Sequence, residues 1–277
     1  MPNNLFLCEF HRPNIKISTF HEIIHALLHS FNSLGQKSYY FQNICLSDGV
    51  NIAIGTHRLF QSFDQVPPLP ENTIILNLEP LNEFSTETSH KKYLEFLSRS
   101  TVIDYSPHNV DLLNRLGNRN IFQFKFGFFP FLNNLSVPRL DHFLFYGTIS
   151  SRRKLALDSF IQRKLPLKVI TNSWAFERDY EIISSKFILN ISKMDNSPLE
   201  IYRLWHALCL NTPIISEKGT DLELVNLWSD YVLFIEDLEI VDFEFITKQL
   251  ISPEIYFNNT LFSDSCNELL SWISSIY

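Results

Sequence analysis

The sequence predicts an α/β protein with parallel β-sheets. Short apolar runs alternate along the chain with segments whose apolar residues recur at helical spacing, a pattern typical of parallel sheets covered by helices. Hydrophobic residues make up 45% of the 277 residues and charged residues 19%, which is enough apolar material for a substantial core. The length suits one large domain or two of medium size.

The first half carries the elements of one parallel sheet. Leu5–Phe10 is an apolar run that predicts the first strand. Thr19 and Glu22 have the spacing of a capping box, which predicts a helix start, and Gly35 suits its end. Further strands are expected at 38–42, 51–55, 73–78, 101–105 and 122–126, with helices near 88–98 and 108–116.

The second half repeats the alternation after a polar segment, 132–141, that contains Pro138 and is expected to be a linker. Strands are expected at 142–146, 167–171, 186–191, 212–216 and 231–235, with helices near 151–163, 176–184, 198–210, 242–250 and 263–275. The two series predict two Rossmann-like domains, residues 1–136 and residues 137–277. The last helix is the element expected to be able to pack back on the first domain.

Composition excludes several classes of protein. A net charge of -7 argues against a nucleic-acid binder and against broad adhesion to anionic membranes, although a local basic patch leaves peripheral membrane contact open. The four cysteines form no CxxC pair, so a zinc ribbon has no support, and scattered cysteines fit a reducing compartment. No apolar stretch reaches about 18 residues, and the N-terminal one is too short for a signal peptide. We therefore expect a cytoplasmic protein.

The first motif with chemical content is a strand, a glycine turn and a basic helix start. It comprises Gly147 followed by Arg152, Arg153 and Lys154. Cations are disfavoured at a helix N-terminus, where anions bind well, so three of them there need a reason. Because both standard glycine-rich phosphate loops are absent, this turn is the candidate for holding a diphosphate without a metal. The alternative is a solvated basic turn.

The second motif opens the helix expected at 198–210. Ser197 and Glu200 have capping-box spacing, with Pro198 at the first helical position, so Glu200 is expected to cap the helix or to accept bonds from ribose hydroxyls. Arg203 lies on the same helix face as Glu200, away from the apolar stripe.

The stretch from Phe145 to Glu217 resembles the donor-binding domain of bacterial GT-B glycosyltransferases, and the first half is similar to their acceptor domain. The resemblance implies that Gly147, Arg152, Arg153 and Lys154 grip the donor diphosphate and that Glu200 binds its ribose. It also implies that the turn with Asn172 and Trp174 meets the base, packing of the aromatic residues being the alternative. Retaining members carry a glutamate where this chain has Ser192, so the stereochemical course stays open.

Candidate catalytic residues follow strands of the first half. His11 follows the first strand and Glu79 ends another, and either is a candidate base for an acceptor hydroxyl, with a structural role as the alternative. His21, His25 and His29 share a helix face, but no further ligand is evident, so we expect a solvated face and no metal site. The aromatic run 126–131 is expected to pack in the core or at a hinge, the alternative being a patch for a lipid-linked acceptor.

The basic turn and the resemblance together predict a metal-independent enzyme that moves a sugar from a nucleotide-sugar donor to a hydroxyl acceptor. The resemblance alone implies polysaccharide biosynthesis, with a surface glycan or lipid-linked glycan as the acceptor. The alternatives are a noncatalytic nucleotide-binding or sugar-binding module of the same fold, and an α/β enzyme of different chemistry such as a sugar epimerase.

Overall fold

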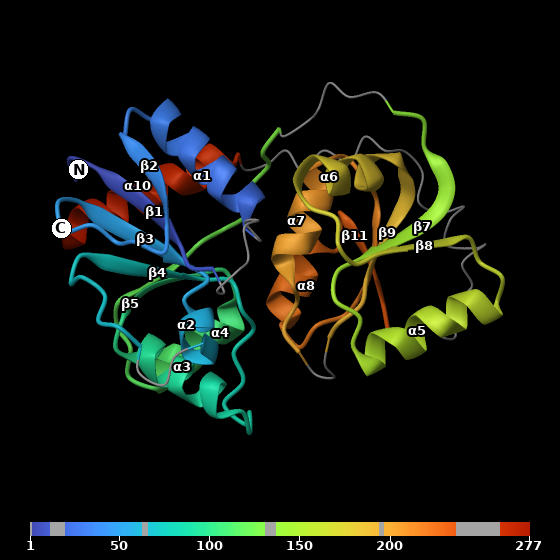
Figure 1. Cartoon of the computed structure of the whole chain (residues 1–277), viewed down its shortest axis with the longest axis horizontal. Coiled ribbons are helices and arrows are strands. Elements are labelled where there is room, and N and C mark those ends of the chain that lie inside the picture. Colours follow the sequence, from blue (N-terminus) through green and yellow to red (C-terminus); the bar gives the residue numbers. More distant parts are fainter. Residues whose placement is uncertain (1, 12–19, 63–65, 131–136, 194–196, 237–260) are drawn as a thin grey trace. The chain divides into compact units, whose positions relative to one another are not determined.

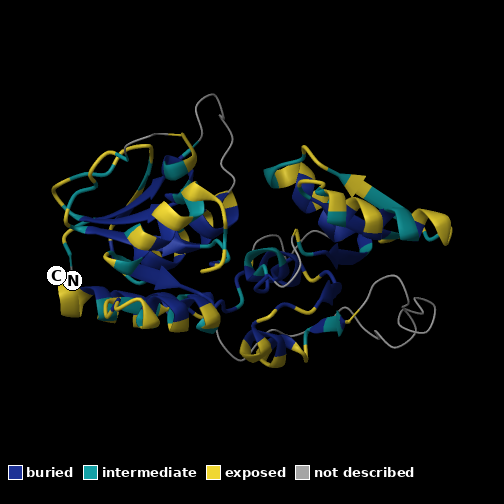
Figure 2. Cartoon of the chain, turned by 90° about the horizontal axis from the view of Figure 1, so that it is seen from below, coloured by how far each residue is buried: buried dark blue, intermediate teal, exposed yellow. Residues whose placement is uncertain are grey.

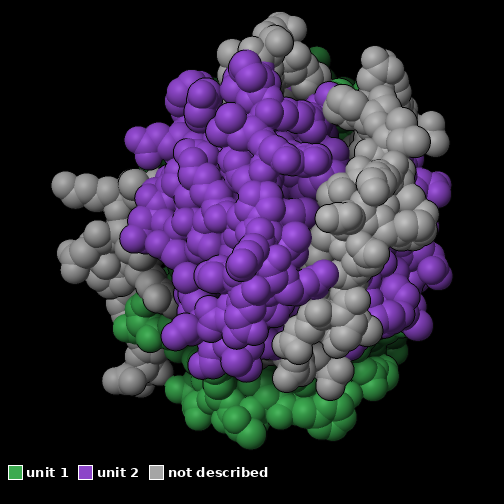
Figure 3. Space-filling model, turned by 90° about the vertical axis from the view of Figure 1, so that its right-hand side faces the viewer, with its two compact units in different colours: residues 1–129, 260–277 green, residues 130–259 purple. Residues whose placement is uncertain are grey.

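The computed structural model describes residues 2–11, 20–62, 66–130, 137–193, 197–236 and 261–277. The chain divides into two compact units, residues 1–129 with 260–277, and residues 130–259 (Figure 3). The sequence places the boundary at 136/137 and leaves the last helix open to either domain. In the structure that helix belongs to the first unit.

Unit 1 is a parallel sheet with the strand order β2-β1-β3-β4-β5-β6. Helices α1 and α10 cover one face of this sheet, and α2, α3 and α4 cover the other (Figure 1). Its elements are β1 (Leu5–Glu9), α1 (His21–Ser33), β2 (Ser38–Gln42), β3 (Val50–Ile54), α2 (His57–Ser62), β4 (Thr73–Asn77), α3 (Thr88–Ser98), β5 (Thr101–Asp104), α4 (Pro107–Arg115), β6 (Ile121–Gln123) and α10 (Phe262–Ile276).

Unit 2 is a parallel sheet with the strand order β11-β10-β9-β7-β8. Phe160 of α5 packs on Phe143 of β7, and α6 and α7 contact β7, β9 and β10 (Figure 1). Its elements are β7 (Leu140–Tyr146), α5 (Ser151–Gln162), β8 (Leu167–Ile170), α6 (Ala175–Ser184), β9 (Ser185–Asn190), α7 (Ile201–Cys209), β10 (Ile214–Glu217), α8 (Leu222–Trp228) and β11 (Val232–Ile235).

The central strands are buried on both faces, as the apolar runs predict (Figure 2). In unit 1, Ile52 and Leu76 face α1 and α10, while their neighbours Ala53 and Ile75 pack with α2, α3 and α4. Because side chains alternate along a strand, each central strand supplies an apolar residue to both faces of the sheet. The polar residues lie at the carboxyl ends of the strands, where open parallel sheets bind ligands.

The aromatic run packs in the core where the structure describes it, as expected. Phe126 and Phe129 are buried, and both ring systems meet Phe262 of α10. The histidine face of α1 is exposed, and the rings of His25 and His29 meet Phe129 edge-on. Partial desolvation of the ring, with His21 and His29 nearby, lowers the pKa of His25.

Most expected elements are confirmed, with differences of a few residues at their ends. Helices α2 and α8 are additions, because each has only one or two turns and little periodicity. The expected helix at 242–250 and Thr19 of the first capping box lie outside the described residues. None of the described helices has both the length and the apolar composition needed to span a bilayer.

Candidate functional site

The turn after β7 is built on a glycine. Gly147 has φ +119°, and a Cβ at this position would lie 3.0 Å from Nη2 of Arg203. The chain then enters α5, where Ser150 is the N-cap and its hydroxyl accepts the Arg153 N–H at 3.2 Å. Glycine thus serves twice here, since it allows the left-handed turn and leaves room for the Arg203 guanidinium.

Arg153 points into the protein, and its side chain is only 3% exposed. Nε donates to Ile191 O at 2.8 Å, Nη1 to Thr148 O at 3.0 Å and Nη2 to Oε1 of Glu200 at 2.8 Å. Burial, with Arg203 nearby, lowers the pKa of Arg153, and Glu200 opposes that shift. This guanidinium therefore ties together the carboxyl ends of β7 and β9 and the start of α7.

The other two cations of the motif point elsewhere. Arg152 makes a bidentate pair with Glu217, at 2.7 and 3.0 Å, and donates to Ser192 O at 2.9 Å. The same Glu217 accepts the Ser192 N–H at 2.8 Å, while Lys154 is exposed. The side chains of these three consecutive residues therefore lie in three different environments: one is buried, one is paired with Glu217 and one is exposed. Their predicted contacts with a diphosphate stay predictions.

The predicted capping box, with Ser197 as N-cap and Glu200 as the third helical residue, was wrong. Helix α7 begins at Ile201, and Glu200, now the N-cap residue, makes no side-chain capping bond. Its carboxylate lies instead between two guanidinium groups, with Oε1 on Arg153 and Oε2 3.2 Å from Nη2 of Arg203. Charge-assisted bonds to arginine are stronger than a bond to a neutral backbone amide, which explains why the Glu200 carboxylate pairs with the arginines and does not cap the helix. Ser197 is buried, and its carbonyl accepts the Thr220 N–H at 3.1 Å.

Arg203 completes the group. Its guanidinium carbon lies 5.2 Å from the ring centroid of Tyr146, and Nη1 lies 3.4 Å from Oδ1 of Asn190. The side chain is 12% exposed. Of the predicted donor residues, the structure brings together Gly147, Arg153, Glu200 and Arg203 at the carboxyl ends of β7 and β9, where open parallel sheets bind ligands.

Asn172 and Trp174 follow β8, which neighbours β7. Gly147 N donates to Ile170 O at 3.0 Å, so the two turns start from adjacent strand ends. Asn172 is exposed, Trp174 is partly buried, and Phe176 is 63% exposed. The exposed aromatic ring is at odds with simple core packing, and contact with a base stays a prediction.

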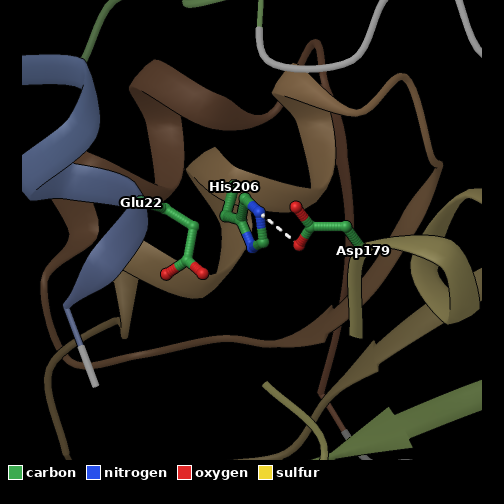
Figure 4. A group of neighbouring side chains, drawn as sticks. All are labelled: Glu22, Asp179 and His206. Carbon is green, nitrogen blue, oxygen red and sulfur yellow. Dashed lines mark ion pairs between the residues drawn. The ribbon is translucent and has the colours of Figure 1, made fainter. Parts of the chain in front are cut away.

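An unpredicted buried ion pair lies between α6 and α7 (Figure 4). His206 Nε2 is 3.0 Å from Oδ1 of Asp179, with both side chains largely buried. His206 stands between apolar residues of α7, and Asp179 is one of several charged residues in the first half of α6, so the sequence holds no spacing signal that would pair them. The pair links the helix that carries Arg203 to its neighbour.

In unit 1, His11 follows β1 and is paired with a carboxylate. Its Nε2 lies 3.0 Å from Oε2 of Glu9, and the side chains are 3% and 0% exposed. The Tyr40 hydroxyl donates to Glu9 Oε2 at 2.8 Å, and Nη1 of Arg58 lies 4.0 Å from its Oε1. Glu9 was not among the predicted site residues, because a single acidic residue inside the apolar run 5–10 gives no pattern that points to chemistry.

Glu79, the second candidate base, follows β4 and is also paired with a histidine. Oε1 of Glu79 lies 3.5 Å from Nε2 of His57, and the side chains are 39% and 16% exposed. His57 follows β3, the neighbour of β4. The carboxyl edge of one sheet therefore presents two histidine–carboxylate pairs.

Comparison with known proteins shows the fold. No family model matches the chain. Two uncharacterised proteins of Acanthamoeba polyphaga mimivirus are 32% and 28% identical, over 153 and 169 residues or 53% and 59% of this chain. The chain spans 49% and 23% of their lengths.

Three solved structures are similar over 98% of this chain. AviGT4, a glycosyltransferase involved in avilamycin A biosynthesis, has a TM-score of 0.65 at 9% identity, with 97% of its chain covered. Anabaena HepE in complex with UDP and glucose scores 0.55 at 10% identity, with 98% covered. An α-glucosyltransferase in complex with UDP-glucose and DNA containing an abasic site scores 0.52 at 10% identity, with 95% covered. The chain therefore has the fold of the GT-B glycosyltransferases, two parallel sheets flanked by helices.

Proposed function

We propose that this protein is a glycosyltransferase that moves a sugar from a nucleotide-sugar donor to a hydroxyl acceptor without a metal ion. The observation that carries the proposal is the Glu200 carboxylate held between Arg153 and Arg203 beside the Gly147 turn. The GT-B fold supports it, because similar structures hold UDP, glucose or UDP-glucose.

On the donor side, we assign the two arginines different tasks. Arg203 is the more exposed guanidinium at the Gly147 turn, which supports assigning it to neutralise the charge that develops on a departing diphosphate. The Arg153 guanidinium donates its hydrogen bonds to groups of the protein itself, and one of them holds the Glu200 carboxylate in place. The Glu200 carboxylate accepts hydrogen bonds from the ribose hydroxyls. The nucleoside part of the donor is bound by Ser197, Asn172 and Trp174.

On the acceptor side, we assign the two histidine–carboxylate pairs. If the enzyme inverts, His11 takes the proton of the acceptor hydroxyl, because the buried Glu9 stabilises the imidazolium that forms. Glu79 is more exposed, and its carboxylate binds acceptor hydroxyls. We favour a surface glycan or a lipid-linked glycan as the acceptor. We also propose that the protein is cytoplasmic and makes peripheral contact with the membrane. The net charge of -7 disfavours DNA, the ligand of one similar structure.

The test starts with UDP, GDP and CMP in a thermal-shift screen, followed by release of UDP from UDP-glucose with and without a sugar acceptor. Arg203→Ala should raise the dissociation constant for the bound nucleotide about tenfold or more, since a hydrogen bond to a charged group contributes about 1.5–3 kcal/mol. The control is Arg163→Ala, an exposed arginine of the same unit.

Turnover by the parent protein supports the enzyme. Binding without turnover would favour the noncatalytic module, and no stabilisation by any nucleotide would overturn the donor site.

A further inference from the structure

A buried carboxylate lies at the end of β5. Asp104 is fully buried, and its carboxylate accepts from Nδ2 of Asn77 at 2.7 Å, from Nδ2 of Asn109 at 3.1 and 3.2 Å, and from Ser106 N at 2.9 Å. Burial raises the pKa of Asp104 to about 7, against the effect of these bonds. Burying a carboxylate costs free energy unless it is both hydrogen-bonded and paired with a cation, and these donors are all neutral amides, so the position invites a functional account.

The two amides that Asp104 orients also hold the backbone of Glu79. Asn77 Nδ2 donates to Glu79 O at 2.9 Å, and Asn109 Nδ2 donates to the same oxygen at 3.1 Å. Glu79 N donates to Asn77 Oδ1 at 3.2 Å, and Leu81 N donates to Asn109 Oδ1 at 3.0 Å. Both backbone polar groups of Glu79 are therefore fixed by side chains that converge on Asp104.

The same network reaches the partner of Glu79. The Tyr93 hydroxyl donates to Asn77 Oδ1 at 3.0 Å. The Tyr93 ring lies edge-on to His57, with ring centroids 6.1 Å apart. His57 in turn lies 3.5 Å from the Glu79 carboxylate. One buried polar network thus supports both members of a pair that is itself partly exposed.

We propose that Asp104 is a positioning residue for acceptor binding, which acts by orienting Asn77 and Asn109 so that they fix Glu79. This inference rests on the proposed function, in which Glu79 binds acceptor hydroxyls. A network that only satisfied buried polar groups would support the fold without any selective effect on the acceptor.

The first test needs no activity. Asp104→Asn places an amide donor among groups that already donate, so Asn77 and Asn109 lose part of their anchor. Hydrogen exchange followed by mass spectrometry should show faster exchange in peptides that cover residues 78–84 and unchanged exchange in α1. The matched control is Asp111→Asn, an exposed aspartate of α4. Unchanged exchange at 78–84 in folded Asp104→Asn would overturn the proposal.

The second test is a double-mutant cycle with Glu79→Gln, using UDP-glucose as donor and p-nitrophenyl β-D-glucopyranoside as acceptor. Asp104→Asn should raise the acceptor KM about fivefold to tenfold, the scale of a lost polar contact, with the donor KM unchanged. Because Asp104 acts through Glu79, adding Asp104→Asn to Glu79→Gln should raise the acceptor KM little further. Additive effects, or an equal rise in the donor KM, would overturn the positioning role.

Tyr93→Phe is the variant to use if Asp104→Asn does not fold, because it removes one hydroxyl and keeps the ring. It should accelerate exchange at 78–84 to a smaller extent, and its effect on the acceptor KM should vanish in the Glu79→Gln background. An effect that persists there would contradict the proposal. A parent protein without turnover would instead overturn the glycosyltransferase assignment, leaving hydrogen exchange to decide whether Asp104 fixes Glu79.

Discussion

Replacing Arg153 by alanine should destabilise unit 2 strongly. The change removes three hydrogen bonds from a side chain that is 3% exposed, two to carbonyls at strand ends and one to Glu200. Breaking a buried ion pair by removing one partner costs about 3–5 kcal/mol. Glu200 keeps Arg203 as a partner, so we expect the lower part of that range.

Urea unfolding followed by tryptophan fluorescence measures this loss, because three of the four tryptophans, Trp174, Trp205 and Trp228, lie in unit 2. With a slope of about 1–3 kcal/mol per molar urea, the midpoint should fall by roughly 1–3 M. Lys154→Ala, the exposed neighbour, should stay within about 0.5 kcal/mol of the parent. A loss below about 1 kcal/mol in Arg153→Ala would refute the role of Arg153 in holding Glu200 and the strand ends, and would favour the contact with the donor diphosphate that the resemblance implies.

Three further results are expected. Glu200→Gln loses the ionic part of its contacts with Arg153 and Arg203, so calorimetry should show weaker nucleotide binding, by about tenfold per 1.4 kcal/mol; unchanged affinity would exclude a donor role. Transfer should survive EDTA, and activity that is lost and then restored by Mn²⁺ would contradict the metal-free mechanism. The pKa of Asp104 is raised from 3.8 to about 7, so its contribution to stability is present below pH 4 and is lost as the pH rises through 7. Urea unfolding at several pH values should show this decline in the parent and not in Asp104→Asn.

The sequence was sufficient to predict the order of the strands and of the longer helices that the structure describes, because parallel strands buried on both faces leave continuous apolar runs between amphipathic helices. Strand β2 was predicted with its observed bounds, and β1, β3 and β4 to within one residue. Helices α2 and α8 were missed, since six or seven residues carry too little periodicity to stand out.

The candidate site was predicted only in its residue types. Side-chain direction at the start of α5 depends on where buried acceptors lie, and nothing in the run Arg152–Lys154 says which cation turns inward. The capping box failed at Glu200 because its competitors, Arg153 and Arg203, are charged, and one of them lies far away in sequence. His57 lies near Glu79 only because the sheet brings the ends of β3 and β4 together, whereas Glu9 was overlooked although it stands two residues before His11.

The path of the chain sets an order for folding during synthesis. Unit 1 begins the chain, yet α10, which supplies the fully buried Phe262, Cys266 and Ile273 to its core, follows the whole of unit 2. Domains generally fold as units while the chain emerges from the ribosome. Unit 2 can therefore complete its core first, while the sheet face of unit 1 is covered by α1 alone and stays exposed where α10 will pack. A nascent chain stalled before α10 should bind chaperones through that face of unit 1.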